Sequence, residues 1–537
     1  KMVTWDPQLN DTDATSDQET IEDEDTDVTP PLRQSERLRS TWSMPERMQQ
    51  YYGAFSLADE DPSAPETYHE ALACPDSNKW KAAIKSELDS LAANGTWFYT
   101  VLPPRRKAIG TKWVFKHKTD ETGKVIRYKA RLTAKGYAQV EGLDYNETYA
   151  PTSRYSTVRI FLVLALQLKL TLMQMDIKTA FLYGVLEEEI YLNPPQGVDV
   201  PQGKVLRLRK SLYGLKQAPR VWNETIHKSL TALGGSNSAY DECIYVFREG
   251  SDIALLNLFV DDILLAFLGV MLRDKIVTAL KSTYDVSDMG TPKFCLGMGF
   301  EVTEQCIKLS QGAAVDKFLR RFNLDKTTPV LIPMDTNFKS IPRDHLVEPL
   351  CTMPYRAAIG CLLYLSQCTR PDIALAVGIL ARFSNDPAQR HWVAVKRIFK
   401  YLAGTRDLAL TLNRNENCDV AMMGYSDSSY GDDEVTRRST SGFLYMLYGN
   451  VITWASKLQP IVTLSTCEAE YVALCFACCE GVWIKNLLDS LGLKEATQSA
   501  IKLMGDNQGS LILAEKNGNH SKSKHIQIRY HKIKDLV

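Results

Sequence analysis

The stretch Ile253-Ala-Leu-Leu-Asn-Leu-Phe-Val-Asp261-Asp262-Ile-Leu-Leu-Ala-Phe267 places two adjacent carboxylates inside an apolar, β-favouring run. Burying an ionised Asp is costly unless the group is paired or binds a metal. A turn at the tip of a β-hairpin removes this cost, because both Asp side chains then reach solvent or a cation at the strand ends. Two interpretations follow: an ordinary hairpin with a polar turn, or part of a divalent-cation site of a nucleotidyl transferase. The second interpretation requires a third carboxylate from elsewhere in the chain.

Length and composition indicate a globular protein of several units. Of the 537 residues, 45% are hydrophobic and 24% are charged. A chain of this length is expected to form about three to four folding units. No apolar stretch reaches the roughly eighteen uncharged residues that a membrane span needs, and no secretory signal is visible at the start. The twelve cysteines have no regular spacing, which favours reduced thiols in an intracellular compartment over a disulfide framework.

The net charge of −1 conceals an uneven distribution. Residues 1–32 hold ten Asp or Glu and only Lys1, a local charge of −9, so the remaining chain carries +8. We expect residues 1–64 to be a disordered acidic spacer, because they contain too few large apolar residues to offset the entropy of ordering. A positive balance in the remainder is compatible with nucleic acid as a partner.

Order begins near Tyr68. Residues 80–91 have helical apolar spacing and end at Asn94-Gly95, and strands are predicted over 97–102, 111–118 and 125–132. Between residues 105 and 135 basic side chains far outnumber acidic ones, and Trp113, Phe115 and Tyr128 lie among them. This pattern is typical either of a solvated face or of a β-ribbon that grips a phosphate backbone or a triphosphate.

The third carboxylate follows a predicted buried helix over residues 156–170. In Thr171-Leu-Met-Gln-Met-Asp176-Ile a strand ends in an Asp that precedes Asp261 by 85 residues. That sequence separation is long enough for a helix and a hairpin to lie between the two segments, so that their strands can be neighbours in one sheet. Three Asp at the ends of antiparallel strands can hold two Mg²⁺ about 3.5–4 Å apart, the arrangement that polymerases use.

Five motifs together resemble the reverse transcriptase of copia-type LTR retrotransposons, and they occur in the order of that family. They are Lys129-Ala-Arg-Leu-Thr-Ala-Lys-Gly136, Glu147-Thr-Tyr-Ala-Pro151, Gln174-Met-Asp-Ile-Lys-Thr-Ala-Phe-Leu-Tyr-Gly184, Ser211-Leu-Tyr-Gly-Leu-Lys-Gln-Ala-Pro-Arg220-Val-Trp222 and Phe259-Val-Asp-Asp262. The resemblance runs from about Glu66 to the end of the chain. It implies an α+β multidomain protein, with a right-hand polymerase of fingers, palm and thumb, a helical connection and a ribonuclease H-like domain.

The resemblance also implies roles for individual residues. Asp176, Asp261 and Asp262 would hold Mg²⁺ (or Mn²⁺), and Phe181 would be the steric gate against a ribose 2′-hydroxyl. The remaining residues are implied to bind nucleotide or nucleic acid, although each also has a plain structural role open to it. They are Lys129, Arg131 and Lys135 in the fingers ribbon, Lys216 and Gln217 against template and incoming nucleotide, and Phe294, Leu296 and Gly297 in the primer grip.

Two further regions follow the polymerase motifs. Residues 336–415 show helical spacing with starts near Pro354, Pro371 and Pro387, which the family uses as thumb and connection. From residue 421 onward, strands, then a helix with Glu, then a strand ending in Asp resemble a ribonuclease H domain, in which Asp427, Glu470 and Asp506 would bind Mg²⁺. Glu468 is the rival of Glu470. The chain stops at Val537 before the usual final strand–helix unit, so we expect this nuclease to be incomplete and weak.

The resulting hypothesis divides the chain into a spacer (1–64), fingers and palm (65–335), thumb and connection (336–415) and an incomplete ribonuclease H-like domain (416–537). It predicts an RNA-directed DNA polymerase that copies element RNA into cDNA for later DNA integration. The expected partners are an RNA template, a DNA primer, RNA–DNA hybrid, dNTPs and other parts of the Gag-Pol polyprotein, without a membrane. The expected location is a cytoplasmic virus-like particle, with nuclear entry left open. The alternative is a catalytically silent, nucleic-acid-binding or domesticated protein derived from such an element.

Overall fold

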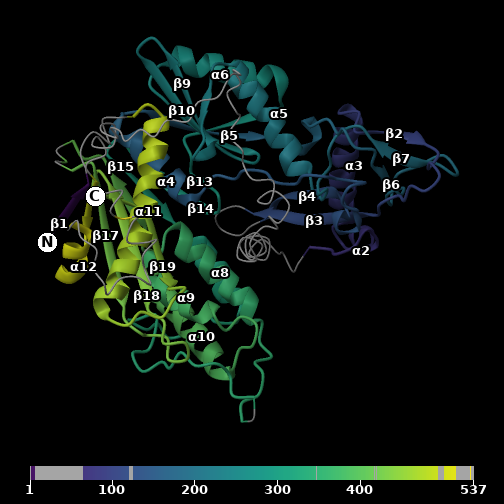
Figure 1. The fold of residues 1–537 in the computed structure, drawn as a ribbon. Coiled ribbons are helices and arrows are strands. Elements are labelled where there is room, and N and C mark those ends of the chain that lie inside the picture. Colours follow the sequence, from purple (N-terminus) through teal and green to yellow (C-terminus); the bar gives the residue numbers. More distant parts are fainter. Residues whose placement is uncertain are drawn as a thin grey trace, which may run out of the picture.

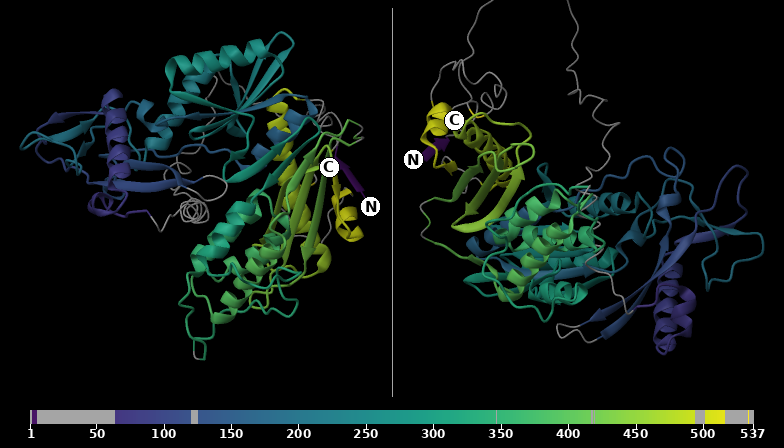
Figure 2. Two further views of the ribbon diagram at one scale, coloured as in Figure 1. Left: turned by 180° about the vertical axis from the view of Figure 1, so that it is seen from behind. Right: turned by 90° about the horizontal axis from the view of Figure 1, so that it is seen from below.

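The computed structural model describes residues 2–5, 64–119, 125–345, 347–416, 418, 420–493, 501–515 and 533. In these residues helices and strands are mixed along the whole chain, and the strands form five sheets. Figure 1 shows the elements in space, and Figure 2 shows them from behind and from below. Most of the predicted spacer, residues 6–63, lies outside the described residues.

A six-stranded antiparallel sheet contains the stretch that carries Asp261 and Asp262. Its strand order is β12-β5-β11-β10-β9-β8. The strands are β5 (Thr171–Ile177), β8 (Ser236–Ser238), β9 (Asp241–Glu249), β10 (Asp252–Phe259), β11 (Asp262–Phe267) and β12 (Val286–Gly290).

Helices cover both faces of this sheet, which explains why its central strands are apolar without alternation. Leu255 and Leu264 pack in one core cluster with α4 (Tyr155–Gln167). Leu256 and Leu265 face the opposite way, into a cluster with α5 (Ala218–Ala232) and α6 (Val270–Thr283). The predicted buried helix is therefore confirmed as α4, three residues shorter at its end than expected.

The first ordered region lies beside this sheet, and its core is centred on Trp80, which is 1% exposed and contacts Phe115 and Tyr128 edge to face. The predicted end of its long helix is also confirmed, with Asn94 at the cap and Gly95 at a φ of 58°. The elements are α2 (Tyr68–Ala73), α3 (Ser77–Ala93), β2 (Trp97–Thr100), β3 (Thr111–Thr119), β4 (Val125–Ala134), η2 (Gly136–Ala138), η3 (Ala180–Tyr183), β6 (Tyr191–Leu192) and β7 (Val205–Leu208).

The middle region combines a small sheet of order β13-β14-β15-β16 with a group of helices. The helix starts predicted near three prolines are confirmed, but β16 was not predicted; its few residues pair with β15, a strand about a hundred residues earlier. The elements are β13 (Phe294–Cys295), β14 (Met298–Val302), β15 (Cys306–Ser310), α7 (Gly312–Arg321), α8 (Tyr355–Cys368), η4 (Pro371–Ile373), α9 (Ala374–Ala381), α10 (Gln389–Gly404) and β16 (Leu410–Asn413).

The last region is a five-stranded sheet of order β1-β20-β17-β18-β19, in which β17 and β20 are parallel. Helix α11 packs on β17 and β18. The elements are β17 (Met422–Ser429), β18 (Thr440–Leu447), β19 (Asn450–Leu458), α11 (Thr466–Ser490), β20 (Ile501–Met504) and α12 (Gln508–Glu515). The chain end beyond α12 lies outside the described residues except for Ile533.

Strand β1 (Met2–Trp5) is an exception to the disorder expected for the spacer. It pairs antiparallel with β20, opposite Ile501–Met504. An edge strand such as β20 presents unpaired backbone groups, and a short apolar segment can satisfy them.

Helix α11 is long and apolar enough to cross a membrane by length and composition alone. However, 56% of its most apolar window is buried inside the protein, as expected of a core helix. The twelve cysteines all lie among the described residues, and no disulfide joins any two of them.

Candidate functional sites

The turn between β10 and β11 presents Asp261 at the tip of a hairpin, as predicted. Phe259 pairs with Asp262, so Val260 and Asp261 form the two-residue turn. Val260 has a φ of 58°, which costs a β-branched residue about 1–3 kcal/mol. The indole Nε1 of Trp222 donates to its carbonyl at 2.7 Å, and this bond holds the strained turn in place.

Asp176 lies directly opposite Asp262 on the neighbouring strand β5. The backbone N–H of Ile177 donates to the carbonyl of Asp261 at 2.9 Å, so β5 is joined to the turn itself. Side chains that face each other across an antiparallel pair project from the same face. The structure therefore brings the ends of the three predicted Asp-bearing segments together, and each of the three side chains is half-buried.

The ligand atoms of these three carboxylates are less tightly grouped than those of a second set of carboxylates. Among the described residues, a group of three ligand atoms within 4.8 Å of one another occurs at Asp427, Glu470 and Asp506, and not at Asp176, Asp261 and Asp262. Like charges on neighbouring positions favour side-chain conformations that separate them.

Tyr213, which the sequence analysis did not single out, joins this site to the basic ribbon. Its ring contacts Phe181 edge to face at 4.7 Å, and the guanidinium carbon of Arg131 lies 4.6 Å from its centroid. Burial raises the pKa of the Tyr213 hydroxyl to about 12; Arg131 opposes this rise, and the charges of Asp261 and Asp176 add to it. The only available sequence signal was its place in the Ser211–Trp222 motif.

The β3–β4 ribbon has one apolar and one basic face. Trp113 and Phe115 face the core with Leu132 and Ala130, whereas Lys116 lies opposite Lys129 and Val114 opposite Arg131 on the other face. Like charges directly opposed on a sheet are destabilising, and an anion on this face would offset that cost. Lys135 lies at the base of the ribbon, where its N–H donates to the carbonyl of Gly110 at 2.9 Å.

The structure gives Gln217 a role inside the protein. It is 1% exposed, its amide donates to the carbonyl of Asp144 at 2.9 Å, and its side-chain oxygen accepts from Gln139 at 2.9 Å. The ammonium of Lys216 donates to the Tyr145 hydroxyl at 2.8 Å. Direct contact of Gln217 with template is therefore not favoured, because its side chain is buried and both polar atoms of its amide already form hydrogen bonds.

The β13–β14 hairpin lies next to the carboxylates. Burial raises the pKa of the Cys295 thiol, and the charge of Asp262 adds to the rise. Phe294 is 51% exposed, and Leu296 and Gly297 both have positive φ. The hydroxyl of Tyr364 on α8 donates to the carbonyl of Leu296 at 3.1 Å, so a helix from a later segment supports this turn.

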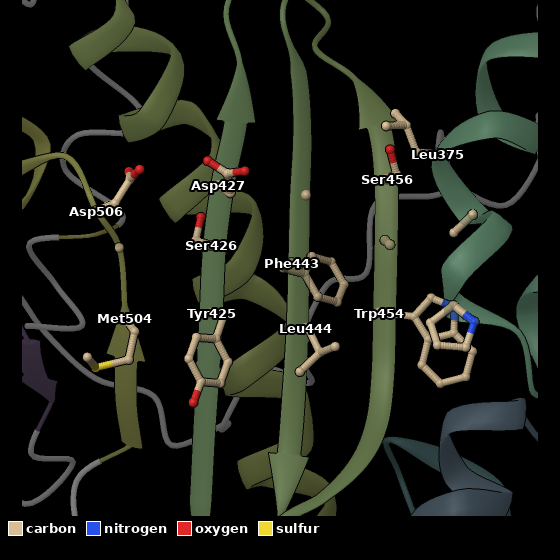
Figure 3. Close-up of a pocket in the computed structure, with 15 residues that line it drawn as sticks. Leu375, Tyr425, Ser426, Asp427, Phe443, Leu444, Trp454, Ser456, Met504 and Asp506 are labelled. Atoms are coloured by element: carbon tan, nitrogen blue, oxygen red, sulfur yellow. The ribbon is translucent and has the colours of Figure 1, made fainter. Parts of the chain in front are cut away.

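The second site is a compact group of three carboxylates. Asp427 is on β17, Asp506 follows the parallel neighbour β20, and α11 supplies Glu470 from below the sheet. Figure 3 shows Asp427 and Asp506 side by side at the same end of their strands. Ser428 donates to Glu470 through its N–H at 3.0 Å and its hydroxyl at 2.7 Å. Burial raises the pKa of Glu470, and the neighbouring charges of Asp427 and Asp506 add to the rise.

Glu468, the rival of Glu470, has another task. It accepts a bond from the N–H of Leu464 at 2.6 Å, while its own N–H donates to the hydroxyl of Ser465. Such a reciprocal arrangement satisfies free N–H groups at the start of a helix. The geometry thus favours Glu470 as the third member of the cluster.

A groove of about 580 Å³ opens beside this cluster. Its floor is the sheet face with Tyr425, Leu444 and Trp454, and its far wall includes Leu375 of α9 (Figure 3). The two carboxylates Asp427 and Asp506 lie at one end of the groove. The site therefore combines an acidic end with a mostly apolar floor.

Comparison with known proteins relates the part of the chain that contains the first site to reverse transcriptases. Residues 94–336, which include Asp176, Asp261 and Asp262, match the family described as "Reverse transcriptase (RNA-dependent DNA polymerase)". A foamy viral protease-reverse transcriptase solved in complex with dsDNA matches at 12% identity with a TM-score of 0.42, covering 91% of this chain and 92% of that chain.

Curated proteins similar to this chain include Pol polyproteins of plant transposons. The retrovirus-related Pol polyprotein from transposon TNT 1-94 of Nicotiana tabacum is 38% identical over 94% of this chain and 38% of its own length. The one from transposon RE2 of Arabidopsis thaliana is 35% identical over 91% of this chain and 33% of its own length. Residues 94–336 thus match the reverse transcriptase family, and over 90% of the chain is similar to Pol polyproteins of plant transposons, which confirms the resemblance to copia-type elements. The chain spans about a third of the length of these relatives.

Proposed function

We propose that the protein is an RNA-directed DNA polymerase, and that Asp176, Asp261 and Asp262 are its metal ligands. The observation that carries this proposal is the pairing of Asp176 with Asp262 beside the turn that presents Asp261. A donor set made only of carboxylate oxygens suits Mg²⁺ or Mn²⁺. When bound there, the ions would lower the pKa of the primer 3′-hydroxyl and stabilise the leaving pyrophosphate.

The protein's own residues would position the substrates. In this proposal the basic face of the ribbon, with Lys129, Arg131 and Lys135, holds the triphosphate. Phe181, braced by Tyr213, closes the space beside the sugar and excludes a 2′-hydroxyl. We further assign residues 65–335 to fingers and palm and residues 336–415 to thumb and connection.

Two other groups would act on the nucleic acid. Phe294, with Leu296 and Gly297 in the adjacent turn, would steady the primer end. Gln217 would act by holding the Lys216 segment in place, since its own amide is occupied. Residues 416–537 are assigned to a ribonuclease H-like domain, in which Asp427, Glu470 and Asp506 would hold divalent ions for hydrolysis of RNA in a hybrid.

Primer extension tests the polymerase proposal. On poly(rA)/oligo(dT) with dTTP and Mg²⁺ or Mn²⁺, we expect elongated primers that disappear when a chelator is added. A protein that binds the duplex but never elongates it, with either metal, would instead be the catalytically silent binding protein named as the alternative.

A prediction for the second cluster concerns Mn²⁺ binding. Glu470→Gln removes one charged ligand, so we expect the affinity for Mn²⁺ at this cluster to fall by about tenfold or more. Glu468→Gln is the matched control, because Gln can keep the helix-start bond, and it should leave affinity unchanged. Titration calorimetry of both variants and wild type measures this, and equal affinities in all three would refute the assignment.

The same site should respond to pH in a defined direction. The pKa of Glu470 is raised, so its proton is retained to a higher pH than in an ordinary carboxyl group. Mn²⁺ must displace that proton. Affinity should therefore weaken on acidification from pH 8 towards pH 5, beginning above the ordinary carboxyl range, and this dependence should be smaller in Glu470→Gln.

A further inference from the structure

Arg159 is a charged residue in the middle of an apolar helix. It is 4% exposed, and every residue of α4 from Ser156 to Leu166 is buried. Burial lowers the pKa of its guanidinium to about 10. Within the described part of the chain no carboxylate forms a direct ion pair with it, although the charge of Glu480 on α11 acts on it from a longer distance. A buried charge without a directly bonded counter-ion is costly, so the hydrogen bonds of the guanidinium decide how it is stabilised.

Those contacts come from two elements far away in the sequence. The Nε of Arg159 donates to the carbonyl of Ile452 on β19 at 2.6 Å. Its Nη1 donates to the carbonyls of Gln367 at 2.7 Å and Cys368 at 2.8 Å, in the last turn of α8. Carbonyls at the end of a helix lack partners within the helix and carry partial negative charge. The helix end thus stabilises the guanidinium by direct hydrogen bonds, and the charge of Glu480 adds to this from a longer distance.

Trp454 on β19 completes the junction. The guanidinium carbon of Arg159 lies 4.1 Å from its ring centroid, and the indole Nε1 donates to the carbonyl of Ser366 at 2.8 Å. Three successive carbonyls of α8 are therefore bound by α4 or β19. The sheet that carries Asp427 is joined here to the helix that packs under the sheet of Asp176 and Asp262.

The same α8 also reaches the first site. Its Tyr364 hydroxyl donates to the carbonyl of Leu296, in the turn of the β13–β14 hairpin. The last five residues of this helix thus contact both the hairpin beside the first carboxylates, through Tyr364, and the sheet of the second carboxylates, through Ser366. Arg159 is the residue that bonds to both partners of the junction.

We propose that Arg159 is a positioning residue that sets the separation of the two carboxylate sites, so that synthesis and RNA cleavage occur at a set spacing on one hybrid. The spacing claim rests on the proposed function, whereas the junction itself does not. Lysine cannot replace arginine here. Its ammonium is compact, so it cannot donate to several carbonyls in one plane as the guanidinium does, and it cannot stack flat on Trp454.

Arg159→Lys tests the proposal, and Arg370→Lys is the matched control. Arg370 is 3% exposed and binds the carbonyl and hydroxyl of Thr405 and the carboxylate of Asp372, all within the middle region. With a chain-terminated primer on a labelled RNA template, we expect wild type and Arg370→Lys to cut the RNA at one narrow range of distances from the primer end. Arg159→Lys should broaden that range while extension stays within about twofold. An unchanged range would overturn the spacing claim.

Amide hydrogen exchange tests the junction without relying on activity. In Arg159→Lys we expect exchange about tenfold faster at β19 and at the last turn of α8, with no such change at β19 in Arg370→Lys. If wild type extends but does not cleave, the spacing claim fails; if it neither extends nor cleaves, the proposed function fails as well. In both cases exchange alone decides about the junction. Equal exchange at β19 in both variants would overturn it.

Discussion

Asp261→Asn is expected to abolish primer extension, with a loss of about a thousandfold or more. The neutral amide of Asn binds a divalent ion much more weakly than a carboxylate does. The bound ions would stabilise the transition state by several kcal/mol, so their loss would remove most of the rate. Because Asp261 lies in a solvent-reaching turn and not in the core, the fold should survive the change. Single-nucleotide incorporation under saturating dNTP measures the effect, with circular dichroism as a check on folding.

Asp252→Asn is the matched control for this experiment. Asp252 begins the same strand β10, about 25 Å from the turn at a rise of roughly 3.3 Å per residue. It should leave incorporation within about twofold of wild type. Comparable losses in both variants would mean that the measured effect is general destabilisation, and the assignment of Asp261 as a metal ligand would fail.

Gly214→Ala is expected to cost about 3 kcal/mol of the free energy of unfolding and most of the polymerase activity. Gly214 has a φ of 90°, and an added Cβ would lie 2.2 Å from the carbonyl oxygen of Ala134 at the end of β4. From the other side, a Cβ on Gly136 would lie 2.1 Å from the carbonyl oxygen of Gly214. The two segments approach so closely that neither can move aside. The change would therefore displace the basic ribbon from Tyr213 and from the carboxylates.

Gly234→Ala separates the steric effect from the backbone effect. Gly234 has the same φ of 90°, but nothing lies within 4 Å of the added Cβ. Only the cost of a left-handed backbone remains, about 1 kcal/mol. Urea unfolding and primer extension of both variants should show a large loss in Gly214→Ala alone, and equal losses would contradict the close-approach argument.

The meeting of the three Asp-bearing segments could be predicted from the sequence, because its signals are local. A run of apolar residues interrupted by Asp261 and Asp262 can be satisfied at a hairpin tip, and a strand that ends at Asp176 can pair beside it. Both expectations depend on the period of a strand and the cost of a buried charge, which act within a few residues. The helix starts near prolines in the middle region are predictable for the same reason.

Other features depended on which distant segments meet in the folded chain. Glu468 and Glu470 are two residues apart on one helix, so only their neighbours could show that one closes the helix start and the other faces Asp427. Gln217 is buried and hydrogen-bonded to Gln139 and Asp144, which are more than seventy residues earlier in the sequence. Strand β16 and the bonds of Arg159 join residues about a hundred to almost three hundred positions apart. Neither the propensity nor the periodicity of a segment specifies such partners, because they are selected by packing and hydrogen-bond satisfaction across the whole chain.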